Sequence, residues 1–318
     1  MKTAETRRIV IAVLVSLGFM GVIAGAASAS GVALLLFPEL AALSYDVFLR
    51  PRGTWASAPW MLAISPALAA VLGICVTRYL PYSGVSIVIC IVGTMLLLKL
   101  IRSPIVPAIS ACFLALALGE TSWLYPLAIL CGTSSLAILG SINRRIYVGD
   151  AQPVVASAVD QIDDQIETLP TQYAWVPAFA LFLTIAYLVS LGSGMKMVLF
   201  PPVVVLAYEM FAHADVCPWA KRPLLLPAIC VLAASAGVAA IAALGAGVIS
   251  TVLVMLFGVV LLRATRIHAI PALAIGLLPQ IMAHADWHFP LAVGIGSILL
   301  TIGFLLFQAF PIGKPHSA

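Results

Sequence analysis

One segment of this chain occurs twice, about half the chain apart. The stretch 96–102, LLLKLIR, is followed by Pro-Ala-Ile at 107–109; it returns as VLLRATR at 260–266, followed by Pro-Ala-Leu at 271–273. The correspondence extends to both sides at an offset of 163 or 164 residues, in the pairs Phe37 and Phe200, Tyr45 and Tyr208, Phe48 and Phe211, Trp123 and Trp287, and Pro126 and Pro290. The chain therefore has to build one substructure twice and pack the two copies together.

The composition places both copies in a membrane. Hydrophobic residues make up 63% of the chain and charged residues 9%, with a mean hydropathy of +1.15. A soluble core does not need so much apolar surface, so the bilayer is the expected solvent. The stretch from Ile9 to Pro38 carries no charge, and it is too long for the core of a signal peptide, so we expect a retained span there.

Each half contains six apolar segments, and this pattern predicts an all-α integral membrane protein. The second and fifth segments of each half are short for the roughly 20 residues of a straight span, so they either cross the bilayer or re-enter it. The segments are 9–29, 32–49, 60–79, 85–101, 104–118 and 123–142 in the first half, and 173–191, 197–211, 224–244, 248–262, 267–283 and 287–310 in the second.

The positive charges favour about 12 transmembrane helices. If all twelve segments cross and the N-terminus is cytoplasmic, only Arg78 and Lys196 of the sixteen Lys and Arg residues face outward; with eight crossings, nine do. The positive-inside rule then predicts two parallel six-helix repeats with short or broken second and fifth helices, and both termini in the cytoplasm. We expect a multi-pass protein of the bacterial inner membrane.

A linker separates the two predicted repeats, which cover residues 1–142 and 173–318. The stretch 143–172 holds five of the twelve acidic residues of the chain. Apolar residues recur in it at helical spacing from Val154 to Ile166, which indicates a short amphipathic helix on the cytoplasmic surface. The alternative is a plain acidic tether kept in solution by its charges.

Charged residues within the apolar segments are the first candidates for a site, because ionisable groups are costly in a bilayer. Asp46 and Glu209 occupy matching places of the two halves, whereas Glu39 occurs in the first half only. We interpret all three as coupling or ion-pair residues. Asp46 is expected to pair with Arg102 or Lys99, and Glu209 with Arg266 or Arg263.

Prolines and small residues mark the second and fifth segments, as in the broken helices that line many transporter sites. A helix start after each basic residue would also present free N–H groups. The predicted substrate-binding residues are Arg102, Arg266, Pro107, Pro271, Ser44 and Ser110.

The sequence offers little evidence for a metal site or a catalytic site. His284, Asp286 and His288 lie close together without an evident fourth metal ligand, and the six cysteines form no CxxC pair. The chain has no GxSxG, HExxH or P-loop motif. We therefore expect no enzyme activity, no metal, no cofactor and no nucleic-acid partner. The expected partners are the bilayer, a small-molecule or ion substrate and, as an open alternative, further copies of this chain.

Each half resembles the HPP family and the wider superfamily of fusaric-acid-resistance-type and aromatic acid exporters and aluminium-activated malate transporters. The resemblance rests on Phe37–Phe48 and Phe200–Phe211, and on the basic, proline-rich stretches 102–108 and 266–272; the family's His-Pro-Pro is replaced by IVP at 105–107 and AIP at 269–271. It implies a fused dimer of six-span units that passes anions, with nitrite or organic acids as substrates.

Two hypotheses of different classes follow. The first is a transporter or channel that moves a small solute between the two repeats, and the doubled basic residues favour an anion as that solute. The second is a membrane subunit that transports nothing itself and acts as an assembly or regulatory partner through the acidic linker.

Overall fold

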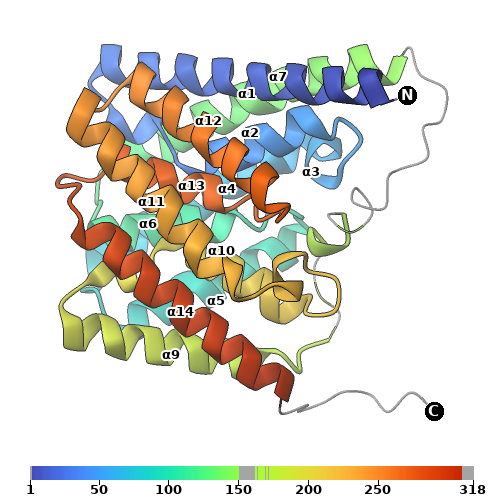
Figure 1. Ribbon diagram of the computed structural model, residues 1–318. Coiled ribbons are helices and arrows are strands. Elements are labelled where there is room, and N and C mark those ends of the chain that lie inside the picture. Colours follow the sequence, from blue (N-terminus) through green and yellow to red (C-terminus); the bar gives the residue numbers. More distant parts are fainter. Residues whose placement is uncertain (1, 150–161, 163, 169, 171, 310–318) are drawn as a thin grey trace, which may run out of the picture.

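The computed structural model describes residues 2–149, 162, 164–168, 170 and 172–309, and the described residues contain helices and no strands (Figure 1). Eight helices are long and apolar enough to cross a membrane, which makes the chain a multi-pass membrane protein by length and composition. They are α1 (Lys2–Ser30), α4 (Pro59–Tyr79), α5 (Gly84–Ile101), α7 (Leu124–Gly149), α9 (Val176–Ser193), α11 (Leu225–Leu244), α12 (Val248–Thr265) and α14 (His288–Ala309).

Four shorter helices correspond to the second and fifth segments of each half. They are α2 (Glu39–Leu49), α6 (Ala108–Leu118), α10 (Pro201–Ala212) and α13 (Ala272–Leu277). Eleven helical residues rise only about 16 Å, roughly half of a hydrocarbon core. The structure thus gives eight helices of span length where twelve spans were predicted, because the short segments begin with stretches that are not α-helical. Twelve crossings stay a prediction.

Prolines explain where the short helices begin. Pro107 and Pro271 stand directly before α6 and α13, and α10 begins with two prolines, which suits the first turn of a helix where no N–H partner is needed. Arg102 and Arg266 end the preceding helices α5 and α12 in the left-handed conformation, with φ of 53° and 55°. The remaining short elements are η1 (Ala33–Leu35), α3 (Thr54–Ser57), η2 (Lys196–Leu199), η3 (Trp219–Lys221) and η4 (Leu278–Gln280).

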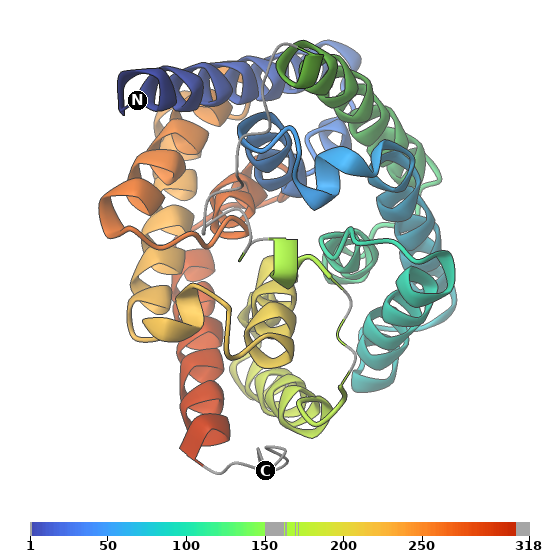
Figure 2. The same ribbon diagram turned by 90° about the vertical axis from the view of Figure 1, so that its right-hand side faces the viewer.

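The long helices surround the short ones (Figure 2). Inside this ring each short helix packs against one from the other half, α2 against α13 and α6 against α10. Small residues allow the close approach within each half. A methyl group on Gly73 of α4 would overlap the Cys112 carbonyl of α6, and one on Gly237 of α11 would overlap the Gly276 carbonyl of α13. The buried core of the bundle is therefore formed by helices too short to span it.

Polar contacts identify the two ends of the helix bundle. At one end, which we call the linker end, Arg8 donates to the Leu49 carbonyl at 3.0 Å and the Lys99 ammonium donates to the Tyr173 hydroxyl at 2.9 Å. At the opposite, far end, Arg78 Nε donates to the Thr121 carbonyl at 2.8 Å. Figure 1 shows the start of α1 and the end of α14 on the side of the linker end. Most of the predicted amphipathic linker helix lies outside the described residues.

Candidate functional site

A buried arginine is the centre of the polar network at the linker end. Arg50 follows α2 and is 4% exposed, and Asp46, one turn earlier, is fully buried. The Nε of Arg50 donates to Oδ1 of Asp46 at 2.6 Å. The local sequence explains this geometry, because the following Pro51 disfavours continuation of the helix and leaves Arg50 four residues after Asp46 on the same face.

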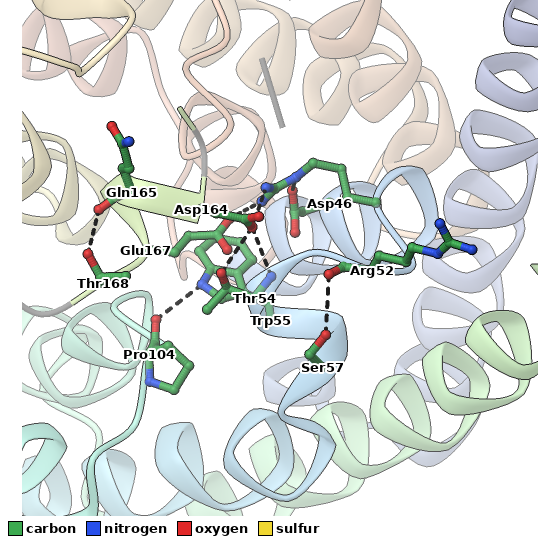
Figure 3. Close-up of polar contacts among 11 residues, drawn as sticks. Asp46, Arg52, Thr54, Trp55, Ser57, Pro104, Asp164, Gln165, Glu167 and Thr168 are labelled. Carbon is green, nitrogen blue, oxygen red and sulfur yellow. Dashed lines mark hydrogen bonds and ion pairs between the residues drawn. The ribbon is translucent and has the colours of Figure 1, made fainter. Parts of the chain in front are cut away.

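The linker brings two more carboxylates to the same guanidinium. Nη1 of Arg50 donates to Oδ1 of Asp164 at 3.1 Å, and Nη2 donates to Glu167, which is also buried. Asp164 Oδ1 further accepts hydrogen bonds from the backbone N–H and the hydroxyl of Thr54, each at 3.0 Å. Figure 3 shows Asp164 and Glu167 turned toward Asp46 and Thr54. Arg50 thus ties the linker to the end of α2.

The stability of this buried cluster depends on keeping the guanidinium and its carboxylates together. A guanidinium has five N–H donors in a planar fork that suits carboxylates, so one arginine can satisfy several at once. Removing one partner of a buried ion pair typically costs about 3–5 kcal/mol, because the other charge stays buried.

The second half meets the linker from the other side. Its matching position to Arg50 is His213, whose pKa is lowered by burial while the nearby Thr168 backbone opposes that shift. Glu209, the match of Asp46, is 3% exposed and lines a cavity of about 20 Å³. Trp55, Ile166, Glu167, Trp219, His268, Ile270 and Pro271 also line this cavity, which has room for about one water molecule. Residues 164–168 therefore lie between matching positions of the two halves.

Glu39 is a second buried carboxylate, in the first turn of α2. It is 3% exposed, and the Ser110 hydroxyl of α6 faces it. Neither group makes a hydrogen bond of ordinary geometry to another described residue. A helix N-terminus favours a negative charge at this place, and the second half has Pro202 there. The two halves therefore differ inside the bundle by one acidic group.

A larger cavity of about 940 Å³ lies between α5 and α9, which we call the α5–α9 groove. Its walls are mostly apolar along both helices. Lys99, Arg102 and Tyr173 line its linker end, where Lys99 also lies 5.2 Å from the centre of the Tyr173 ring. Of the described residues that line it, none is acidic.

The structure separates the predicted substrate-binding residues rather than gathering them. Arg102 is at the α5–α9 groove, Pro271 is at the small cavity, and Pro107 is buried at the start of α6. Ser44 is buried and donates to the Ala41 carbonyl of its own helix at 3.2 Å. Arg266 is exposed and lines neither cavity. The predicted set therefore does not form one site.

Asp46 is in an ion pair, as predicted, but its partner among the described residues differs from the predicted ones. Asp46 pairs with Arg50 rather than with Arg102 or Lys99, since Arg50 is on the same helix face and reaches it without a second element. Glu209 does not pair with Arg263 or Arg266, which are both exposed while Glu209 is buried. Arg263 instead donates to the Tyr45 hydroxyl at 3.4 Å.

Sequence reasoning missed Arg50 as the centre of the network. Its signal was the Asp-x-x-x-Arg spacing at the end of an apolar segment, which we had interpreted as a span end. The linker was given two readings, an amphipathic surface helix or a plain acidic tether in solution, and the burial of Glu167 does not fit a fully solvated tether. At the far end, Oδ2 of Asp286 lies 3.0 Å from Nδ1 of His288, and the contact with His288 lowers the pKa of Asp286. The described residues contain no group of three or more His, Cys, Asp or Glu placed to hold a metal ion.

Comparisons do not add a family to this geometry. No model of a known protein family, no curated protein and no solved structure matches the chain. The resemblance to the HPP family and its superfamily therefore stays a prediction, and the geometry of the described residues is the basis for what the chain does.

Proposed function

We propose that this chain is a membrane transporter or channel for a small organic anion, with its path between the two halves. The observation that carries the proposal is the buried guanidinium of Arg50, which holds carboxylates from α2 and from the linker. Buried ionisable groups in membrane proteins usually mark solute or ion pathways. The interrupted helices from both halves that meet around it are the second support, since irregular backbone at membrane depth requires protein or water beside it.

In this proposal Arg50 is the residue that binds the substrate anion, a role that the sequence analysis predicts for Arg102 and Arg266. A substrate carboxylate competes with Asp164 and Glu167 for the same planar fork of donors. When substrate binds, the linker loses its attachment to Arg50 and the path opens at the linker end. Asp46 stays with Arg50 in both states and holds the guanidinium in place. Glu39, deeper in α2, is the group that carries a coupling proton.

The orientation belongs to the same proposal. We infer that all twelve segments cross the bilayer as two parallel repeats, with the linker end in the cytoplasm of a bacterium. The non-helical stretches before the four short helices add the length that these helices lack. The contacts of Leu49, Lys99 and Tyr173 at the linker end, and of Arg78 at the far end, support this arrangement.

Uptake into proteoliposomes tests the proposal. The assay compares acetate, malate, benzoate and nitrite as substrates, with potassium as a cation, for the wild type, Arg50→Gln and Arg52→Gln. Arg52 is exposed two residues away, so its loss is a matched control for charge. We expect one of the organic anions to be taken up by the wild type and Arg52→Gln, and at least tenfold more slowly by Arg50→Gln.

Two results would count against the proposal. Equal anion uptake by Arg50→Gln and the wild type, at equal reconstitution, removes Arg50 from the path. Absence of uptake for every ion in the wild type favours the rival hypothesis of an assembly or regulatory subunit. That subunit would instead retain a bound partner protein when purified under mild conditions.

A further inference from the structure

The two seams between the halves differ. On one side, α1 packs directly along α12. A methyl group on Gly21 would lie 3.3 Å from Val252, and one on Gly25 would lie 3.6 Å from Val248. This G-x-x-x-G spacing lets two membrane helices approach closely. We call this contact the α1–α12 seam.

On the other side, the matching helices α9 and α5 meet only near the far end. There, a methyl group on Gly84 would lie 3.1 Å from the Tyr187 ring. Toward the linker end the α5–α9 groove separates the helices. In α9, Thr184 and Leu188 stand at the places of Gly21 and Gly25, so α9 lacks the pair of glycines at which α1 approaches α12.

The groove is apolar for most of its length and cationic at one end. Its lining extends on α5 from Gly84 to Arg102, which is about 27 Å of helix at 1.5 Å per residue. Val88, Val92 and Leu96 line it and are also exposed on the lipid-facing surface of the bundle. A hydrocarbon chain can therefore enter sideways from the bilayer without passing through water.

We propose that the α5–α9 groove binds an anionic phospholipid from the leaflet at the linker end. One acyl chain lies between α5 and α9, and the phosphate contacts Lys99, Arg102 and the Tyr173 hydroxyl. The absence of acidic residues among the described lining residues makes the linker end of the groove complementary to a phosphate. A volume of about 940 Å³ is at the upper end for small-ligand pockets and suits a long chain.

The backbone of Arg102 makes glycine a suitable substitution for testing its side chain. Arg102 has a φ of 53°, a region that costs a residue other than glycine some strain. Glycine would adopt this conformation freely and is common where a helix ends this way. The guanidinium is therefore the feature that an Arg102→Gly substitution removes, while the backbone is relaxed rather than disturbed.

The second seam supplies a matched control. Arg263 and Arg266 correspond to Lys99 and Arg102, and Arg266 has a φ of 55°. Neither residue lines the α5–α9 groove, and α1 packs directly along α12 beside them. The pair Arg263→Gln/Arg266→Gly therefore makes the same changes in charge and backbone as Lys99→Gln/Arg102→Gly, but away from the α5–α9 groove.

Lipid binding to the purified full-length protein tests the proposal. Native mass spectrometry and thermal unfolding are followed while dioleoylphosphatidylglycerol, dioleoylphosphatidylcholine or oleate is added to detergent micelles. We expect phosphatidylglycerol to bind and stabilise the wild type, with phosphatidylcholine much weaker. Each basic residue near an anionic surface contributes about 1 kcal/mol, so Lys99→Gln/Arg102→Gly should bind phosphatidylglycerol about 30-fold more weakly.

Three outcomes would overturn the proposal. The first is equal loss of phosphatidylglycerol binding in the Arg263→Gln/Arg266→Gly control. The second is equal binding of phosphatidylcholine, which would show an apolar patch without headgroup recognition. The third is tighter binding of oleate than of phosphatidylglycerol, which would assign the groove to a free carboxylate. A Thr184→Phe variant, which fills the groove without changing charge, should lose phosphatidylglycerol as well. This test is independent of transport and of Arg50.

Discussion

The α1–α12 seam and the α5–α9 groove show how two related halves can differ in what they leave open. Both contacts join the first long helix of one half to the third long helix of the other. The first is closed at Gly21 and Gly25, whereas the second is open and has Thr184 and Leu188 at the same places. The packed interface is thus the one with the glycine pair, and the open one has larger residues at those places.

A second difference between the halves concerns charge. The first half contributes Glu39, Asp46 and Arg50 to the interior, and the second half has Pro202, Glu209 and His213 at the matching places. Only the arginine is a permanent cation, and it holds the linker. The buried permanent positive charge is therefore in the first half, although the two halves match at the neighbouring positions.

The largest expected effect is at Arg50. Arg50→Gln leaves Asp46 and Glu167 buried without their cation, and we expect the free energy of unfolding to fall by about 3–5 kcal/mol. Arg52→Gln should change it by no more than about 0.5 kcal/mol. Denaturant unfolding in detergent measures both. The double variant Asp46→Asn/Arg50→Gln should recover part of the loss; strictly additive losses would contradict the pairing.

The next largest effect is expected at Gly73 and Gly237, two glycines at matching places of the two halves. Gly73→Ala and Gly237→Ala each place a methyl group against a backbone carbonyl, so each should destabilise the fold by about 1–3 kcal/mol. Gly192→Ala has open space around it and should be neutral or slightly stabilising. Thermal unfolding of the three variants checks this. A loss at only one of Gly73 and Gly237 would show that the halves are packed differently at their centres.

The third prediction introduces the α9 residues of the α5–α9 groove at the matching places of α1, in the α1–α12 seam. Gly21→Thr/Gly25→Leu should force α1 away from α12 and cost about 1–2 kcal/mol of stability. Gly18→Leu, which introduces the α9 residue at a place with open space, is the control. Lipid binding measured on the same samples sharpens the comparison. Unchanged stability in the double variant would mean that helix volume does not decide which seam closes.

The smallest effect is one of pH. Burial lowers the pKa of His213 below its ordinary value of 6.5, so the folded protein holds this proton less tightly than the unfolded chain does. This group has no effect on stability well above pH 6.5, and it reduces stability as the pH falls below that value through the lowered pKa. We expect His213→Gln to reduce the loss of thermal stability between pH 7.5 and 5.5. An identical pH profile in wild type and variant would contradict this.

The sequence predicted an all-α membrane protein and the short second and fifth helices, because hydropathy and prolines act locally; the twelve crossings stay a prediction. The interior was harder to predict. The partner of Asp46 depends on which residue the end of α2 turns toward, and Arg50 looked like any basic residue at a span end. The asymmetry of the seams depends on pairs of residues more than 200 positions apart, such as Gly25 and Val248, whose contact no local pattern specifies.

The central claim is that the linker carboxylates occupy Arg50 and close the path. Initial uptake of the preferred organic anion into proteoliposomes tests it most directly, with Asp164→Asn/Glu167→Gln compared with the wild type and with Asp286→Asn, an exposed acidic residue at the far end. We expect faster uptake and half-saturation at a lower anion concentration for the linker variant, and no change for Asp286→Asn. Unchanged or slower uptake by the linker variant, at equal amounts of folded protein, would contradict the account.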